Sequence, residues 1–178
     1  AGRVKAGDSF WCPGHFEVGG RPFLCWEHKG HKNVSWPLGL MQSCDVYFYN
    51  VGLKAGAALI EKYARDFGLG SLTKIPLKSE KAGHLFGPET RRAVKKGWYD
   101  GDTLNLAIGQ GELTVTPLQM AVVAAALANR GSVWRPHYIQ KIVYADGRPD
   151  YVQKSERMGL VPATDAAWDL VQEGMRLV

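Results

Sequence analysis

The sequence predicts an α+β fold that is mainly helical, with a helical subdomain followed by a short antiparallel strand pair. Two observations carry this prediction. Apolar segments of helical length recur between residues 37 and 131, and the alternation of apolar and polar residues typical of a strand occurs mainly at 133–144. The 178 residues, 46% of them hydrophobic, are enough for one core, so we expect a single unit over residues 1–178.

Residues 1–36 show neither pattern and are expected to form a loop-rich lobe. In the helical part that follows, one helix approaches Ser43 and another leaves from Asp45. A third helix is expected from Gly56 to Phe67, because the glycines of Gly68-Leu69-Gly70 are a stop signal.

The next stretch, from Ile75 to Asp102, is irregular, with a short helix expected over 88–95. A clearer helix begins at Pro117. Thr116 occupies its N-cap position and Gln119 lies three residues later, so the two side chains can satisfy free backbone donors reciprocally. The residues after Gln119 carry no charge for more than two turns, which predicts a helix buried on most sides.

Residues 132–178 are expected to contain the strand pair and a last helix. The run Val133–Tyr144 carries β-branched and aromatic residues, and the turn signal Asp146-Gly147 leads to a partner strand around Tyr151-Val152. Thr164 is placed to cap the last helix. Three apolar residues share one stripe of that helix: Trp168, Val171 and Met175.

The formal net charge is +5, but lysine and arginine are scattered along the chain. The run Arg91–Lys96 is the one cluster, and a solvated face explains it better than a nucleic-acid surface. We therefore expect no nucleic-acid partner, whereas an anionic cell-wall or membrane surface would suit the charge. The sequence contains no run of about eighteen apolar residues, the length that could span a bilayer.

Two short motifs carry the functional argument. Ser43-Cys44-Asp45 places polar groups between two apolar segments, although such a trio also serves as a turn with a helix cap. Gly109-Gln110-Gly111 provides two glycines that can take positive φ angles and let the backbone approach another element closely. Taken alone, the second motif also fits a glycine turn before a well-capped structural helix.

In combination, these motifs resemble the transpeptidase domain of class B penicillin-binding proteins, and most of all the cell-elongation type, penicillin-binding protein 2. The resemblance rests on their order: the Ser-x-Asp trio, an aromatic run at 47–49, Gly-Trp-Tyr-Asp-Gly-Asp-Thr at 97–103, and Gly-Gln-Gly with Thr-Pro-Leu-Gln-Met at 116–120. It covers nearly the whole chain, from Cys12 to Met175. It implies a partial fold of the penicillin-binding and serine β-lactamase type.

The resemblance implies an acyl transfer. A serine attacks the D-Ala-D-Ala carbonyl of a peptidoglycan stem peptide and passes the acyl group to an amine on a neighbouring strand, and β-lactams act as acylating inhibitors. In that scheme Ser43 would relay or position protons, and Asp45 would orient a lysine and the substrate amide. Four residues would support the site without taking part in the chemistry: Gly109, Gln110, Gly111 and Thr116.

The resemblance also implies where the protein works and with what partners. We expect the periplasmic face of the bacterial inner membrane, an N-terminal anchor absent from these residues, and membrane proteins of the elongation complex that maintains cell shape. We also expect an internal fragment that is inactive alone, because the family's Ser-x-x-Lys nucleophile and Lys-Thr-Gly motif do not occur at the corresponding places. Ser71-Leu72-Thr73-Lys74 fits the first pattern but follows the Ser-x-Asp motif, and we interpret it as a coincidence.

The cysteines form a second pattern. All three lie between positions 12 and 44, together with His28 and His31. Thiolate and imidazole are the usual ligands of tetrahedral zinc, and three cysteines with one histidine would close a structural site. His31 is preferred to His28 because its turn resembles one of the family. The expected ligands are Cys12, Cys25, His31 and Cys44.

A metal on Cys44 would hold Ser43 and Asp45 from behind, because Cys44 lies between them. A Cys12–Cys25 disulfide and free buried thiols are the alternatives to zinc. Two further readings of the whole chain stay open: a zinc-stabilised binding module without chemistry, and a β-lactam sensor or β-lactamase of the same fold.

Overall fold

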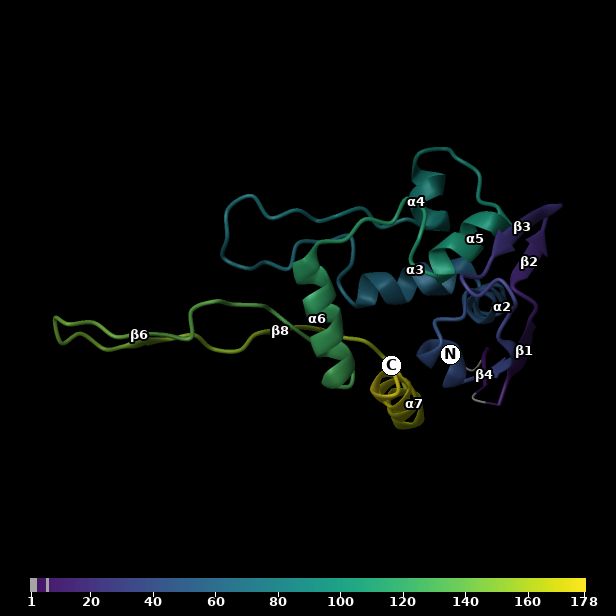
Figure 1. Cartoon of the computed structure of the whole chain (residues 1–178). Helices are drawn as coiled ribbons and strands as arrows, with labels where there is room; N and C mark the ends of the chain where they lie inside the picture. Colours follow the sequence, from purple (N-terminus) through teal and green to yellow (C-terminus); the bar gives the residue numbers. More distant parts are fainter. Residues whose placement is uncertain (1–2, 6) are drawn as a thin grey trace.

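The computed structural model describes residues 3–5 and 7–178, and it mixes helices with short antiparallel strand pairs, as predicted (Figure 1). The helices lie between an N-terminal lobe of strands and a long two-stranded ribbon that extends away from the other elements, to the left of the view. Among the described residues, no helix combines the length and the apolar character needed to cross a membrane.

The N-terminal lobe contains two strand pairs. β1 (Ser9–Cys12) pairs antiparallel with β4 (Lys32–Ser35), and β2 (His15–Val18) pairs with β3 (Arg21–Leu24). Gly19-Gly20, both at positive φ, form the two-residue turn of the second pair. The lobe is thus more regular than the sequence predicts, because strands of four residues are too short for a periodic pattern to stand out.

Three helices follow as predicted. α1 (Leu38–Met41) leads to Ser43, and α2 (Asp45–Ala55) begins directly after Cys44. α3 (Ala57–Asp66) follows after a single residue, Gly56, whose φ of +86° makes the break between the two helices. The junction of α1 and α2 therefore carries the Ser-x-Asp motif.

Two further helices complete this part. α4 (Pro88–Ala93) lies inside the predicted short helix, whereas α5 (Asp100–Ala107) was not predicted. The first residues of α5 include glycine and two aspartates, which have low helix propensity. Tertiary packing decides the outcome: α5 packs against α2 so closely that a Cβ atom on Gly52 would lie 2.4 Å from the Cβ atom of Ala107.

α6 (Pro117–Ala128) begins as predicted. Thr116 Oγ1 accepts a hydrogen bond from Gln119 N at 3.1 Å, and Gln119 Oε1 accepts one from Thr116 N at 2.9 Å. The predicted burial is wrong, because only Gln119 and Ala126 are buried on this helix and Met120 is 48% exposed. Composition indicates that a helix is apolar but not what covers it: α7 and β5 pack against α6, and much of its surface stays exposed.

The C-terminal part contains two more strand pairs. β5 (Ser132–Trp134) pairs with β8 (Arg157–Leu160), and β6 (Lys141–Ile142) pairs with β7 (Tyr151–Val152) to form the ribbon in Figure 1. The turn signal at Asp146-Gly147 lies between β6 and β7, as predicted. The long strand expected before it is divided into β5 and β6, and β8 was not predicted.

α7 (Asp165–Arg176) is capped by Thr164, as predicted. Its Trp168 lies in a small core between α6, α7 and the β5–β8 pair, with these buried members: Ala126, Val133, Val161 and Trp168. A larger core joins the N-terminal lobe to α2 and α5, with these buried members: Cys12, Cys25, Val34, Cys44, Val46, Tyr47, Tyr49 and Leu104. All three cysteines therefore belong to one core.

Candidate functional site

The Ser43-Cys44-Asp45 motif lies where α2 begins. Ser43 is exposed and has a φ of +49°, a left-handed conformation that is uncommon for a residue other than glycine. Cys44 is the N-cap of α2, and its Sγ accepts a hydrogen bond from Tyr47 N at 3.4 Å. Asp45 is the first residue of the helix, where the helix dipole favours a carboxylate. The motif therefore presents a hydroxyl and a carboxylate on either side of a buried thiol.

Trp26 holds this motif from the N-terminal lobe. Its backbone N–H donates to Asp45 Oδ2 at 3.0 Å, and its indole Nε1–H donates to the carbonyl oxygens of Gln42 and Ser43, both at 3.0 Å. The residue as a whole is 60% exposed. Sequence reasoning did not single out Trp26, and its position directly after Cys25 was the only signal that could have done so.

The four predicted ligands come together behind the motif. Their ligand atoms all lie within 4.8 Å of one another, and His28 is exposed and outside the group. His31 Nδ1 lies 3.5 Å from Cys25 Sγ and 3.7 Å from Cys12 Sγ. A tetrahedral zinc with Zn–S bonds of about 2.3 Å and Zn–N bonds of about 2.0 Å separates sulfur from nitrogen by about 3.5 Å. The observed spacing therefore fits a metal between these atoms.

The thiols of this group are free and buried, so no Cys12–Cys25 disulfide is present in this structure. Burial raises the pKa of the Cys44 thiol to about 12 and also raises the pKa of Cys25. A metal that binds here must therefore displace protons from neutral thiols at neutral pH.

His31 faces this cluster through Nδ1, while its other ring nitrogen, Nε2, is buried without a hydrogen-bond partner among the described residues. The imidazole packs edge-on against Trp26, with ring centroids 5.2 Å apart. The His31 ring therefore lies between the thiols and Trp26, whose backbone N–H binds Asp45.

Gly109-Gln110-Gly111 ends α5. Gly109 has a φ of +72°, its N–H donates to Leu106 O at 3.1 Å, and Gln110 N–H donates to Asn105 O at 2.8 Å. This pair of bonds is a Schellman motif, in which a glycine in the left-handed conformation closes the helix. Among the described residues, no hydrogen bond joins this turn to Ser43 or Asp45. Its link to them is the packing of α5 on α2.

Gln119, paired with Thr116 at the start of α6, fastens the loop that carries Ser71-Leu72-Thr73-Lys74. Gln119 is 1% exposed, and its Nε2 donates to the carbonyl oxygens of Ser71 and Ala82, both at 2.8 Å. Ser71–Lys74 is irregular backbone, with Lys74 at a φ of +59°. A Ser-x-x-Lys nucleophile needs both side chains on one turn of helix, so the structure agrees with a coincidental match.

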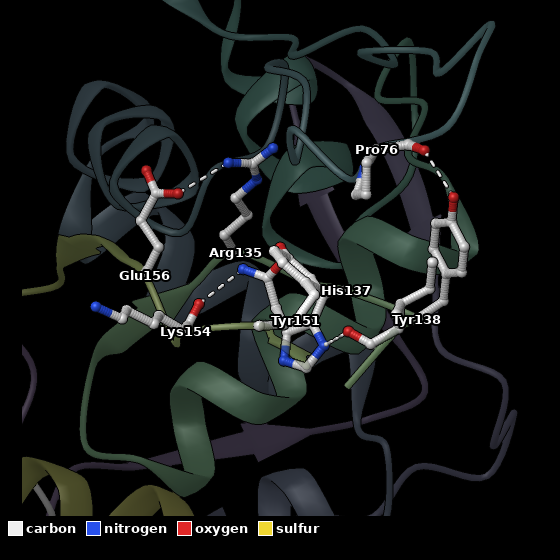
Figure 2. Close-up of a pocket in the computed structure, with 9 residues that line it drawn as sticks. Pro76, Arg135, His137, Tyr138, Tyr151, Lys154 and Glu156 are labelled. Carbon is white, nitrogen blue, oxygen red and sulfur yellow. Dashed lines mark hydrogen bonds and ion pairs between the residues drawn. The ribbon is translucent and has the colours of Figure 1, made fainter. Parts of the chain in front are cut away.

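A cavity of about 350 Å³ lies at the base of the ribbon (Figure 2). Arg135 donates to Glu156 at 2.9 Å and to Lys74 O at 2.7 Å, and the hydroxyl of Tyr138 donates to Pro76 O at 3.0 Å. None of the residues singled out by the motifs lines this cavity. These contacts fasten the ribbon to the 71–80 loop.

Sequence comparison places these features in a family. A family model described as the penicillin binding protein transpeptidase domain matches residues 1–178. The peptidoglycan D,D-transpeptidase MrdA of Acinetobacter baumannii is 33% identical over 168 residues, covering 92% of this chain and 25% of that protein. The chain therefore spans about a quarter of the length of this curated relative.

Solved structures agree with that match. A crystal structure of Pseudomonas aeruginosa PBP2 in complex with WCK 5153 is 31% identical, with a TM-score of 0.80 over 98% of this chain and 39% of that chain. A complex between PBP2 and MreC from Helicobacter pylori is 27% identical, with a TM-score of 0.77 over 98% of this chain and 30% of that chain.

Proposed function

This chain belongs to the penicillin-binding protein transpeptidase family, and from that membership we propose that it forms part of a peptidoglycan D,D-transpeptidase of the elongation type. In this reaction a serine attacks the D-Ala-D-Ala carbonyl of a stem peptide, D-alanine leaves, and an amine of a neighbouring strand takes the acyl group. One observation carries the proposal: Ser43 is exposed and Asp45 partly exposed where α2 begins. These two residues precede Gly109–Gly111 in the chain, which is the order of the family's motifs.

Ser43 and Asp45 have different parts in this proposal. The Ser43 hydroxyl can both donate and accept, so it can pass a proton between the nucleophile, its lysine and the leaving nitrogen. An ionised Asp45 can only accept. Its Oδ2 already accepts from Trp26 N, and among the described residues its Oδ1 accepts no hydrogen bond, so Oδ1 is free to orient a lysine or a substrate N–H.

The nucleophile and the Lys-Thr-Gly motif are proposed to come from sequence outside these 178 residues. The chain contains no Lys-Thr-Gly, and its one Ser-x-x-Lys run, Ser71–Lys74, lies in a loop. The chain alone is therefore expected to bind no β-lactam covalently.

We propose that Cys12, Cys25, His31 and Cys44 hold a structural zinc. The spacing of their ligand atoms and the burial of the three thiols support this. Zinc with four protein ligands has no open position for chemistry, so its contribution is to fix its ligands. Of these, Cys44 transmits that order to the motif, because it caps α2 between Ser43 and Asp45.

Partners and location follow from the same proposal. Stem peptides are the substrates, and β-lactams are inhibitors that acylate the complete domain. The Helicobacter pylori relative forms a complex with MreC, and we propose an elongation-complex protein of that kind as a partner here. The proposed location is the periplasmic face of the bacterial inner membrane.

A labelling experiment with fluorescent penicillin tests the function. The full-length gene product that contains this chain should form a stable covalent adduct, and Ser43→Ala should slow its formation by at least about 100-fold, the lower range for a general acid–base group. Ser71→Ala is the matched control and should change nothing. Equal loss in both variants, or labelling that survives Ser43→Ala, contradicts the proposed role, and rapid turnover of the penicillin would favour a β-lactamase.

A further inference from the structure

We propose that Trp26 is the positioning residue of the Ser43-x-Asp45 motif, an inference that rests on the function proposed above. Trp26 is the one described residue of the N-terminal lobe that hydrogen-bonds both members of the motif. Its backbone N–H donates to Asp45 Oδ2, and its indole N–H is shared between the carbonyl oxygens of Gln42 and Ser43. These bonds hold the Asp45 carboxylate and the backbone of residues 42 and 43 at the same time.

The backbone of Ser43 explains why such a hold is needed. At a φ of +49° this serine occupies a conformation that costs free energy and persists only where surrounding contacts determine it. Ser43 N donates to Leu40 O at 3.1 Å, which fixes its N-terminal side. The indole N–H fixes its carbonyl side, and so the direction in which the hydroxyl leaves the chain.

Asp45 is oriented by the same residue. A carboxylate rotates about its last bond, and a hydrogen bond to one oxygen selects a direction for the other. Because Trp26 N binds Oδ2 at 3.0 Å, Oδ1 is the oxygen left for a substrate or a lysine. Trp26 therefore acts through Ser43 and Asp45, and no contact with substrate is required of it.

The placement of Trp26 depends in turn on the Cys/His cluster. Cys25, the preceding residue, is 1% exposed, and His31 packs against the indole. The Trp26 residue is 60% exposed and contributes little to the core. Its hydrogen bonds, rather than its burial, explain its position, and they make Trp26 the connection between the cluster and the motif.

Trp11 offers a matched control. It is 61% exposed and lies directly before Cys12, as Trp26 lies directly after Cys25. It stacks under the Lys32 ammonium, with 5.8 Å between Nζ and the ring centroid, and makes no side-chain hydrogen bond among the described residues. Replacing it also removes an exposed indole from the lobe and should leave the motif untouched, because Trp11 makes no hydrogen bond to the described residues 42–45.

The experiment compares Trp26→Phe with Trp11→Phe in the full-length gene product. Placing 3-benzothienylalanine at position 26 removes only the indole N–H and keeps the bicyclic shape, so it separates the indole hydrogen bonds to Gln42 and Ser43 from packing, while the backbone N–H bond to Asp45 remains in every variant. For each protein the initial penicillin binding constant, the acylation rate constant, the zinc content and the hydrogen exchange of the amides at 42–47 are measured.

Both changes at position 26 should slow acylation about tenfold, the equivalent of one lost hydrogen bond, with initial binding and zinc content unchanged. They should also speed amide exchange at 42–47, whereas Trp11→Phe should alter neither quantity more than about twofold. Equal slowing by Trp26→Phe and Trp11→Phe, or no effect of 3-benzothienylalanine, overturns the inference. If the unaltered protein takes up no penicillin while the exchange contrast holds, the proposed function fails and the hold of Trp26 on the motif is supported.

Discussion

The two ends of this chain are held together in different ways. At the N-terminal end, short strand pairs and α2 surround three buried thiols and a histidine, in a core that also contains the buried Tyr47 and Leu104. At the C-terminal end, Trp168 packs with three aliphatic side chains between α6, α7 and the β5–β8 pair. The two cores therefore differ in chemistry: the N-terminal core brings four candidate metal ligands together behind the Ser43-x-Asp45 motif, whereas the C-terminal core consists of apolar side chains.

The largest effect is expected from Cys44→Ser. Structural zinc contributes on the order of 10 kcal/mol in small zinc domains at neutral pH, so removing one of four ligands should abolish stoichiometric zinc binding and loosen the N-terminal lobe. Serine is itself a good N-cap, so the start of α2 should survive and the loss should report the metal. Zinc content and the exchange of amides at 9–35 measure this, and His28→Ala, outside the cluster, should leave both unchanged.

At the opposite end, Trp168→Ala should cost about 3–5 kcal/mol, the usual range for deleting a large buried aromatic side chain. The cost should be the same with and without a chelator, because the cluster of Trp168 contains no proposed ligand. Denaturant unfolding measures it. Met175→Ala on the same helix, 45% exposed, should change stability by less than about 0.5 kcal/mol. A chelator-dependent cost for Trp168→Ala would remove the contrast between the two ends.

The pH dependence should differ between the two ends as well. In the metal-free lobe, burial raises the pKa of Cys44 from its ordinary 9.0 to about 12, so the lobe should lose stability as the pH rises from 9 toward 12, because the unfolded chain ionises this thiol before the folded chain does. Zinc binding has the opposite pH dependence, because zinc binds thiolates and its affinity falls as the pH falls. Each displaced proton should weaken binding by about 1.4 kcal/mol for every pH unit of acidification.

Calorimetry in two buffers of different ionisation enthalpy counts the protons released on zinc binding. A release of more than one proton per zinc at pH 7 agrees with neutral buried thiols. No release would mean that the thiols are already ionised or do not bind the metal. Stability at the Trp168 end should show none of this metal-linked dependence.

The smallest effect concerns the start of α6. Thr116→Ala removes the cap on Gln119 N and should cost about 1 kcal/mol. Thr114→Ala is the control, because the Thr114 side chain makes no hydrogen bond among the described residues and only its backbone pairs with His84. Thermal unfolding of both variants measures the difference. Equal costs would show that capping does not set the stability of this helix.

The features that sequence could predict are those with local causes. Thr116, Pro117 and Gln119 predict a helix start from neighbours in the chain, and the structure has it at that position. Ser43 and Asp45 are predicted as site residues from the order of motifs along the chain, and that prediction stays untested. The four cysteine and histidine side chains were grouped correctly, since their residue types are those of a closed zinc site.

The features that sequence missed depend on contacts between distant residues. α5 begins with residues of low helix propensity, and it forms where Ala107 packs against Gly52 and Asp102 Oδ2 accepts a hydrogen bond from Tyr99 N at 3.0 Å. The exposure of α6 depends on what surrounds it rather than on its composition. Trp26 is one of six tryptophans, and nothing local distinguishes it until three hydrogen bonds to residues 42–45 are seen.

The most direct test of the link between cluster and motif is native mass spectrometry of the purified chain before and after chelation, with free thiols counted in parallel. The account predicts one zinc per chain, its loss to the chelator, and three free thiols recovered afterwards. A chain without zinc and with two thiols missing would contradict it, because a disulfide rather than a metal on Cys44 would then hold the lobe.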